Sequence, residues 1–210
     1  CENLTEIDFN TSLISIGDSA FENCKNIQSL NLPDSLTTIG SSAFKDCKGI
    51  QKVNFSVSLN SLDTYAFKSC TSWAERIVIP PDLTEIKMET FAFCTSLISV
   101  QFPDGLNTLN QGCFQNCSSL EGTLNISQVT TVDKYAFKQC SKIEYIIFNE
   151  NLEEIGDHAF QKCESLLNLT CPEKLLTINN YAFSYCSNIS NISFSNKLEN
   201  IYDYAFENCV

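Results

Sequence analysis

The sequence lacks a long uninterrupted apolar stretch, and this absence argues against a membrane-spanning helix. No segment of the 210 residues approaches the roughly eighteen consecutive apolar residues that such a helix needs. The chain does not begin with Met, and no basic region followed by an apolar run marks a signal peptide. Because Cys1 opens the chain in the middle of a recurring pattern, we expect the sequence to be a fragment of a longer array.

Basic side chains and histidine are scarce. Thirteen Lys and Arg residues against twenty-five Asp and Glu residues give a formal net charge of −12. That charge repels phosphate backbones and anionic membrane surfaces, so we expect neither nucleic acid nor a lipid surface as the partner. His158 is the only histidine, and no Ser/His/Asp set, phosphate loop or carboxylate pair stands out. We therefore expect no enzyme activity, no cofactor and no metal site.

What the sequence does contain is an internal repeat of 23 residues. Of the nine intervals between the ten repeated cysteines, eight are 23 residues long and one, from Cys70 to Cys94, is 24. The Cys column is Cys1, Cys24, Cys47, Cys70, Cys94, Cys117, Cys140, Cys163, Cys186 and Cys209. The Phe column, three residues before each later Cys, is Phe21, Phe44, Phe67, Phe91, Phe114, Phe137, Phe160, Phe183 and Phe206.

Each repeat predicts two short strands and a turn of helix. After Cys94, Val100 and Phe102 alternate with polar residues, which indicates a strand with one buried face. A turn that often contains Pro leads to a second extended piece such as residues 36–39. The position of Gly17, Gly40 and Gly156 predicts a left-handed backbone, and the next residue predicts a helix N-cap. A single helical turn, Ala-Phe-x-x-Cys, then completes the unit.

Stacking of the units is expected to bury one Phe and one Cys layer per coil, because no unit can bury its apolar face alone. Two units deviate from the pattern. After Cys70, Trp73 occupies a Leu position and one extra residue precedes Ile77, and after Cys117 the strand slips by one residue. We expect small bulges at both places.

The twelve cysteines do not require a disulfide framework. Ten of them share one column, where side chains in parallel register have poorly placed β-carbons for disulfides. Buried thiols that act as small hydrophobic groups explain the column better, although disulfides remain an alternative. Cys171 falls in an inward strand position, and a Cys113–Cys117 clip or metal pair has no further ligand nearby.

The motif C-x-x-L-x-x-I-x-F-P-x-x-L-x-x-I-G-x-x-A-F resembles the BspA-like leucine-rich repeat family, most plainly over residues 24–44. The predicted fold is an α/β repeat solenoid, a leucine-rich repeat superhelix of nine coils of 23–24 residues. A parallel β-sheet forms one face, and short strands and helical turns form the other. We expect residues 1–210 to form a single domain and a monomer. The resemblance implies a surface or secreted adhesin, associated with virulence, that binds host cells, extracellular matrix or other microbes. A structural spacer or scaffold, with solenoids stacked end to end, is the alternative.

The outward strand positions are the candidate binding face. The residues that we select on it are Lys52, Asn54, Arg76, Val78, Gln101, Tyr145 and Ile147. Arg76, Val78, Tyr145 and Ile147 are the strongest candidates, because Arg and aromatic residues dominate interface energies. A plain solvated sheet face explains the same pattern equally well, so both interpretations stay open.

Other exposed features are N-x-S/T sequons and a tyrosine column. The sequons begin at Asn3, Asn10, Asn54, Asn116, Asn125, Asn168, Asn188 and Asn191. In a host that glycosylates them, sugars on Asn10, Asn54, Asn125, Asn168 and Asn191 would cover the outward strand face. His158 shares a variable column with Tyr135, Tyr181 and Tyr204, for which packing over the turns is favoured over a binding stripe.

Overall fold

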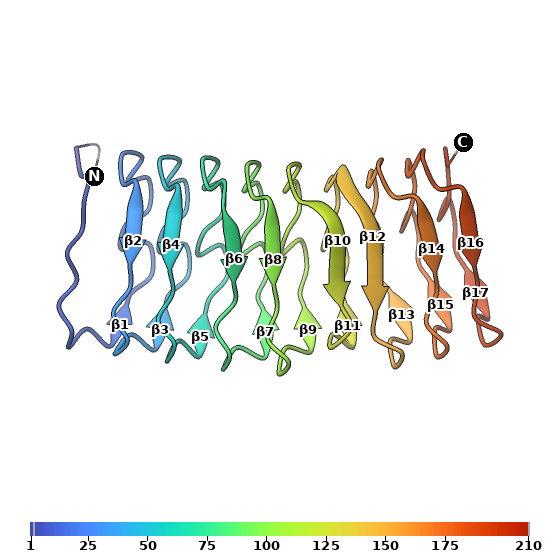
Figure 1. The fold of residues 1–210 in the computed structure, drawn as a ribbon, viewed down its shortest axis with the longest axis horizontal. Coiled ribbons are helices and arrows are strands. Elements are labelled where there is room, and N and C mark those ends of the chain that lie inside the picture. Colours follow the sequence, from blue (N-terminus) through green and yellow to red (C-terminus); the bar gives the residue numbers. More distant parts are fainter. Residues whose placement is uncertain (2, 210) are drawn as a thin grey trace.

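A computed structural model, which describes residues 1 and 3–209, shows a solenoid of parallel strands (Figure 1). The coils lie side by side along the long axis, with the two chain ends at opposite ends of the molecule. Each complete coil contributes two short strands. The first-column strands are β2 (Ser29–Asn31), β4 (Lys52–Asn54), β6 (Arg76–Val78), β8 (Ser99–Gln101), β10 (Glu121–Ile126), β12 (Lys142–Phe148), β14 (Asn168–Thr170) and β16 (Asn191–Ser193). The second-column strands are β1 (Ser15–Ile16), β3 (Thr38–Ile39), β5 (Ser61–Leu62), β7 (Glu85–Ile86), β9 (Thr108–Leu109), β11 (Thr131–Val132), β13 (Glu154–Ile155), β15 (Thr177–Ile178) and β17 (Asn200–Ile201).

The predicted solenoid with parallel strands is confirmed, but nine complete α/β coils are not. Eight coils carry both strands, whereas the first coil contributes only β1 among the described residues. The described residues also contain no helix. In the Ala43–Cys47 segment, the backbone N–H groups of Ala43, Lys45 and Cys47 bond three residues back within the coil. The intervening N–H groups of Phe44 and Asp46 instead donate to Ala66 and Lys68 in the next coil, which prevents a helix.

The same arrangement repeats along the whole turn segment and forms a backbone ladder. Three N–H groups of each coil donate to carbonyl groups of the next coil at 2.7–3.0 Å, and this holds for eight neighbouring pairs of coils. For example, Tyr135, Phe137 and Gln139 donate to Asp157, Ala159 and Gln161. We call this set of bonds the turn ladder. Its bonds run in one direction only, from each coil to the coil that follows it.

Left-handed residues make the turn ladder possible, and they lie elsewhere than the sequence predicts. Two residues per coil have positive φ, for example Ser42 (φ 56°) and Asp46 (φ 58°), whereas Gly40 has none. Gly40 is required for another reason, since a Cβ there would lie 2.7 Å from the backbone nitrogen of Asp18 in the previous coil. The predicted N-caps also act between coils, because the carboxylate of Asp18 accepts the N–H of Ser41 at 2.8 Å.

Stacked phenylalanine rings fill the core. Successive rings of the Phe column lie 5.2–6.0 Å apart between centroids and are tilted by at most 15°. Phe44 to Phe183 are fully buried members of this column, while the end members Phe21 and Phe206 are partly exposed. Each fully buried ring contributes roughly 1.5–3 kcal/mol of transfer free energy to folding.

The inner position at the end of the first strand alternates between a ring and a smaller side chain. Phe55, Phe102 and Phe148 pack edge-on against the Phe column at 5.6–5.8 Å between centroids. The coils that alternate with them carry Leu32, Ile79, Ile126 and Cys171 at the same position. Strand pairing alternates in step: β2 pairs with β4, β6 with β8, β10 with β12 and β14 with β16, and the first column has no other pairing in the described chain. The structural repeat of this face is therefore two coils.

The two deviating units behave differently. The pairing of β10 with β12 shifts register between Gly122 and Thr123, which confirms an irregularity in that unit. β6 pairs with β8 without a shift, so the extra residue after Cys70 produces no bulge in that pair. It accommodates Trp73, which is buried among Phe55, Phe67 and Phe91. Strand pairing is interrupted there, between β4 and β6 and between β5 and β7.

The cysteine column forms hydrogen bonds and no disulfides. All twelve cysteines are free thiols. Eight of them donate to the carbonyl oxygen of the Phe in the previous coil at 3.0–3.4 Å, as Cys140 does to Phe114. Burial raises the pKa of Cys94 and Cys140 to about 12. Cys113 and Cys117 do not form a clip, because they face the carbonyls of different coils.

The central part of the Phe column should be the most sensitive to truncation. We predict that Phe137→Ala lowers the free energy of unfolding by about 3–5 kcal/mol, because the ring is fully buried and stacks on two neighbours. Phe206→Ala, at a partly exposed position with one stacking partner in the Phe column, should cost clearly less. Urea unfolding followed by circular dichroism measures both. Equal losses for the two variants would show that the stack is not the main source of stability.

The thiol column should make the fold sensitive to alkali. The pKa of Cys140 is raised above its unfolded value of about 8.5, so its contribution is fully present below that pH. The contribution is lost as pH rises toward about 12, because the unfolded state then loses its thiol proton first. We predict that the urea midpoint falls between pH 8 and 11, and that it falls less steeply in Cys140→Ala. Parallel pH profiles for the two proteins would contradict this assignment.

Candidate binding face

The structure exposes all seven residues that the sequence selects for binding, and it places them in two groups. Lys52 and Asn54 lie on β4, Arg76 and Val78 on β6, and Gln101 on β8. Tyr145 and Ile147 form the second group on β12, with 41% and 48% of their surfaces exposed. Their pairing partners on β10, Thr123 and Asn125, are smaller and polar.

Arg76 is the centre of the first group. Its guanidinium donates to the side-chain oxygen of Gln101 on β8. Val78 pairs with Gln101 across the β6–β8 register and is 56% exposed. On β4, the amide of Asn54 donates to the Asn31 side chain at 2.6 Å. The face therefore holds the hydrogen-bonded pair of Asn31 and Asn54. Beside it lies Arg76, whose one side-chain hydrogen bond is to a neutral group.

Two hollows flank Arg76, and both coincide with unpaired steps of the first strand column. The hollow between β4 and β6 has a volume of about 390 Å³, and the one between β8 and β10 about 550 Å³. Arg76 lines both. Phe55 lies at the first hollow and Phe102 at the second, so each hollow follows a coil whose inner position holds a ring.

Sequence reasoning missed these hollows and the residues at their rims. Val57 is 63% exposed and lines the first hollow together with Pro80 and Pro81. A signal was present, because Phe102, Phe148 and Phe194 recur every 46 residues, which is twice the repeat length. A search for the 23-residue period alone treats all coils as equivalent, so it does not detect a difference between alternate coils.

The ion pairs lie away from this face. Lys45 pairs with Glu22 at 3.0 Å, Lys87 with Asp63 at 3.3 Å, and Lys68 with Glu89. Arg76 and Lys52 form no direct ion pair among the described residues, although Glu75 and Asp104 line the hollows beside Arg76.

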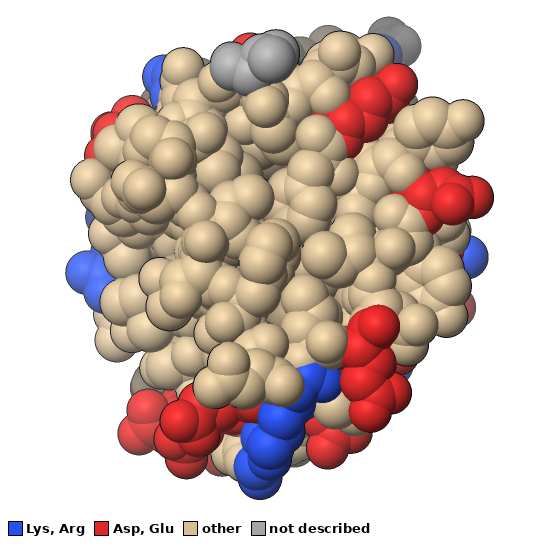
Figure 2. All heavy atoms as spheres, turned by 90° about the vertical axis from the view of Figure 1, so that its right-hand side faces the viewer, with Lys and Arg blue, Asp and Glu red and all other residues tan. Residues whose placement is uncertain are grey.

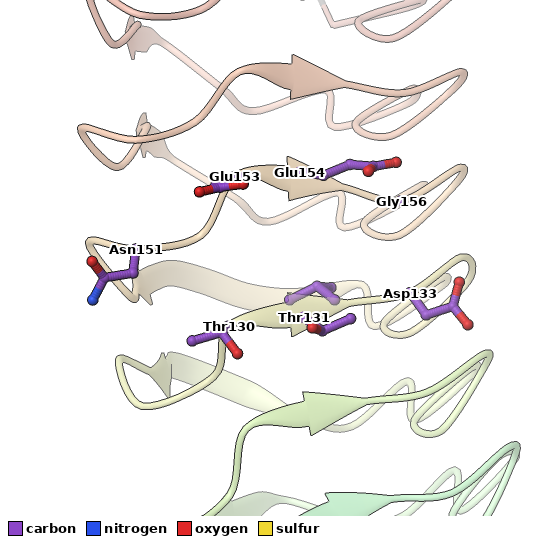
Figure 3. Close-up of a pocket in the computed structure, with 8 residues that line it drawn as sticks. Thr130, Thr131, Asp133, Asn151, Glu153, Glu154 and Gly156 are labelled. Atoms are coloured by element: carbon purple, nitrogen blue, oxygen red, sulfur yellow. The ribbon is translucent and has the colours of Figure 1, made fainter.

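A further hollow, of about 440 Å³, lies beside the second strand column (Figure 3). β11 and β13 pair through only one residue pair there, Val132 with Ile155. The acidic side chains at this hollow do not converge: Figure 3 shows the carboxylates of Glu153, Glu154 and Asp133 apart from one another. The carboxylate of Glu154 already accepts the Asn179 amide at 2.5 Å. Across residues 1 and 3–209, no group of three or more His, Cys, Asp or Glu side chains is placed to hold a metal ion.

The histidine and tyrosine column is a packed stack. The His158 ring lies between Tyr135 and Tyr181, at 4.9 and 4.8 Å between centroids, and Tyr181 stacks on Tyr204. The Nδ1 of His158 is 3.1 Å from the Gln161 side-chain oxygen. The rings of His158 and Tyr181 are covered on both faces by their neighbours, which supports packing over a binding stripe.

The predicted sequons stay predictions, and the structure gives their setting. Seven of the eight asparagines are exposed, while Asn116 is half-buried and has a φ of 60°. Asn54, Asn125, Asn168 and Asn191 lie on first-column strands, as the pattern predicts. Asn10 precedes any strand of the described chain. Within the described ranges, no helix has the length and apolar character needed to cross a membrane.

Comparison with solved structures supports the fold. The chain is similar to a leucine-rich repeat protein of T. pallidum, with 26% identity over 73% of this chain and 72% of that one, at a TM-score of 0.67. It also resembles leucine-rich repeat proteins of Bacteroides ovatus and Eubacterium ventriosum. The first has 21% identity over 94% of this chain and 68% of that one, at a TM-score of 0.58. The second has 19% identity over 96% and 82%, at a TM-score of 0.55.

No curated protein matches the sequence. The BspA type leucine rich repeat region, in contrast, matches residues 1–121 and 122–210, which together span every coil described above. Repeats of this kind are generally non-catalytic and mediate protein interactions. The chain belongs to the BspA type leucine-rich repeat family.

Proposed function

We propose that residues 1–210 act as one non-catalytic, protein-binding repeat domain of a surface or secreted adhesin. The partner is a protein of a host cell, of extracellular matrix or of another microbe, and it contacts the outward strand face. The observation that supports this most directly is the contrast between constant core columns and a strand face that changes from coil to coil. On that face, Arg76 on β6 forms no ion pair among the described residues and lies beside the exposed Val78. The exposed Tyr145 and Ile147 lie together on β12.

The two groups on the strand face suit a wet contact with a few anchors. Arg and Tyr are enriched among residues that dominate interface energies, and apolar neighbours exclude water around them. Arg76 and Tyr145 are therefore the anchors in this proposal, with Val78 and Ile147 as their apolar neighbours. The remaining outward positions are mainly Ser, Thr, Asn and Gln, which hydrogen-bond readily and adapt to the partner.

We predict that the purified chain binds epithelial cells or matrix proteins saturably, and that Arg76→Ala/Tyr145→Ala weakens this binding at least about thirtyfold. The expected loss corresponds to two anchor side chains. Surface plasmon resonance on matrix proteins and flow cytometry on cells measure it.

The matched control is Lys25→Ala/Tyr185→Ala, which removes the same charge and an equally exposed tyrosine away from the first-column strands. This control should bind like the unchanged chain. Absence of binding by a folded chain, or equal losses in both double variants, would refute adhesion through the strand face.

A second candidate function is a structural spacer, in which a further coil, of the same chain or of a second copy, stacks on the C-terminal face. Figure 2 shows this face largely free of charge at its centre, with acidic and basic side chains toward the rim. Phe194, Ile201, Tyr202 and Tyr204 are 45–57% exposed. The N–H groups of Tyr204 and Phe206, equivalent to ladder donors in the preceding coil, have no backbone acceptor among the described residues. The N-terminal coil of a second copy offers the matching carbonyl groups.

Where a second copy stacks on this face, we expect self-association that depends on concentration, in place of the monomer that the sequence predicts. Sedimentation velocity between about 1 and 200 μM should show growing species, and Ile201→Glu should suppress them, because a carboxylate would be buried in the contact. A single monomeric species throughout the range rules out stacking of a second copy on this face.

A further inference from the structure

The only arginine of the chain lies in the only 24-residue unit. The extra residue lies between Trp73 and Ile77, in the short segment that also contains Arg76. This unit also interrupts strand pairing with the previous coil. Arg76 therefore lies at an unpaired step of the first strand column, in the one unit that departs from the 23-residue period.

The guanidinium retains binding capacity. It has five N–H donors, and its one hydrogen bond within the described chain goes to the neutral side chain of Gln101. Lys52 on β4 lines the same hollow and is likewise without an ion pair. Glu75 also lines this hollow, yet it forms no ion pair with Arg76. A carboxylate from outside matches the fork of donors on Arg76, because two parallel N–H···O bonds can form.

Apolar surface lies next to this charge. Val57 and Val78 are 63% and 56% exposed, and both line the hollow between β4 and β6. Pro80 and Pro81 complete its lower wall with rigid backbone. The second hollow, between β8 and β10, is lined mainly by polar groups such as Thr123 and Gln128, and the carboxylate of Asp104 also lines it. An occupant thus meets a mixed hollow that holds the exposed Val57 and Val78, then a cation, then a mainly polar hollow.

The spacing of these features matches an extended chain. The two hollows lie on either side of the β6–β8 pair, so their centres are about two strand spacings, or about 10 Å, apart. Three residues of an extended peptide cover roughly the same distance. A segment that crosses the strands can therefore place an apolar side chain in the first hollow and a carboxylate on Arg76 within three residues.

We propose that the two hollows around Arg76 form one recognition site for an extended, acidic segment of a partner protein. This segment carries an apolar side chain within three residues of an Asp or Glu. The inference rests on the proposed protein-binding function and names the chemistry of the ligand. The partner's carboxylate forms the direct ion pair that Arg76 does not make among the described residues.

Blocked heptapeptides test this site. In one set, Leu and Glu lie two residues apart in a Gly/Ser background, and in the matched set Gln replaces Glu. Fluorescence anisotropy should show binding of the Glu set at least about tenfold tighter than of the Gln set, because a charge-assisted pair is lost in the latter. Arg76→Gln should abolish the preference, and Arg76→Lys should reduce it, since Lys cannot form the bidentate pair.

Lys142→Gln, on β12 of the same face, is the matched control and should keep the preference. Val78→Ser should weaken both peptide sets about equally, because it removes apolar contact and no charge. Circular dichroism and the melting temperature confirm that each variant is folded. The inference is overturned if the Glu and Gln sets bind alike, if the preference survives in Arg76→Gln, or if neither set binds at up to 1 mM.

The peptide test and the test of the proposed function can fail independently of each other. If cells or matrix proteins still bind through the strand face while peptides show no preference for acid, the acidic ligand is wrong and the adhesive function stands. If the acidic peptides bind through Arg76 and no cell or matrix protein binds, the site exists and the partner belongs to another class of protein.

Discussion

The turn ladder is the interaction on which the rest of this structure depends. It joins every coil to the next through three backbone bonds, and it continues across the 24-residue unit, where the pairing of both strand columns stops. Its geometry requires two left-handed residues per coil, including residues such as Tyr65 and Phe93 that pay a steric cost of about 1 kcal/mol or more there. Three cross-coil bonds and the buried Phe column repay that cost in each coil.

Because the turn ladder fixes the spacing of the coils, the strand face is free to vary. The first column tolerates a two-coil alternation, a register shift and an insertion without loss of the solenoid. In an ordinary sheet such interruptions would leave the strands without support. Here they produce the hollows beside Arg76. The turns are constant because they hold the coils together, and the strands can be irregular because they do not have to.

The sequence predicts the core of this protein well, because every core position repeats and each repeat is an independent test of the pattern. The Phe and Cys columns, the direction of the strands and the exposure of Arg76 and Tyr145 follow from spacing alone. The helical turn is wrongly predicted, because Ala-Phe-x-x-Cys has a helical appearance and the competing acceptors lie 22 residues away. The left-handed backbone predicted for Gly40 is wrong for a similar reason. Glycine is needed there because the backbone of Asp18, in the previous coil, lies too close for a Cβ. The hollows depend on a difference between alternate coils, which single-repeat periodicity does not register.

The alternation of ring and smaller side chain at the inner strand position has a consequence for how such arrays change length. Removing or duplicating one 23-residue unit would bring into contact two coils that both carry the ring, or two that both carry the smaller side chain. Such a contact between two coils of the same kind does not occur among the described coils. Removing or duplicating two units preserves the order. Arrays with this alternation should therefore grow and shrink by recombination in pairs of units, and a gene carrying them would show its strongest self-similarity at 46 codons, twice the period of its core.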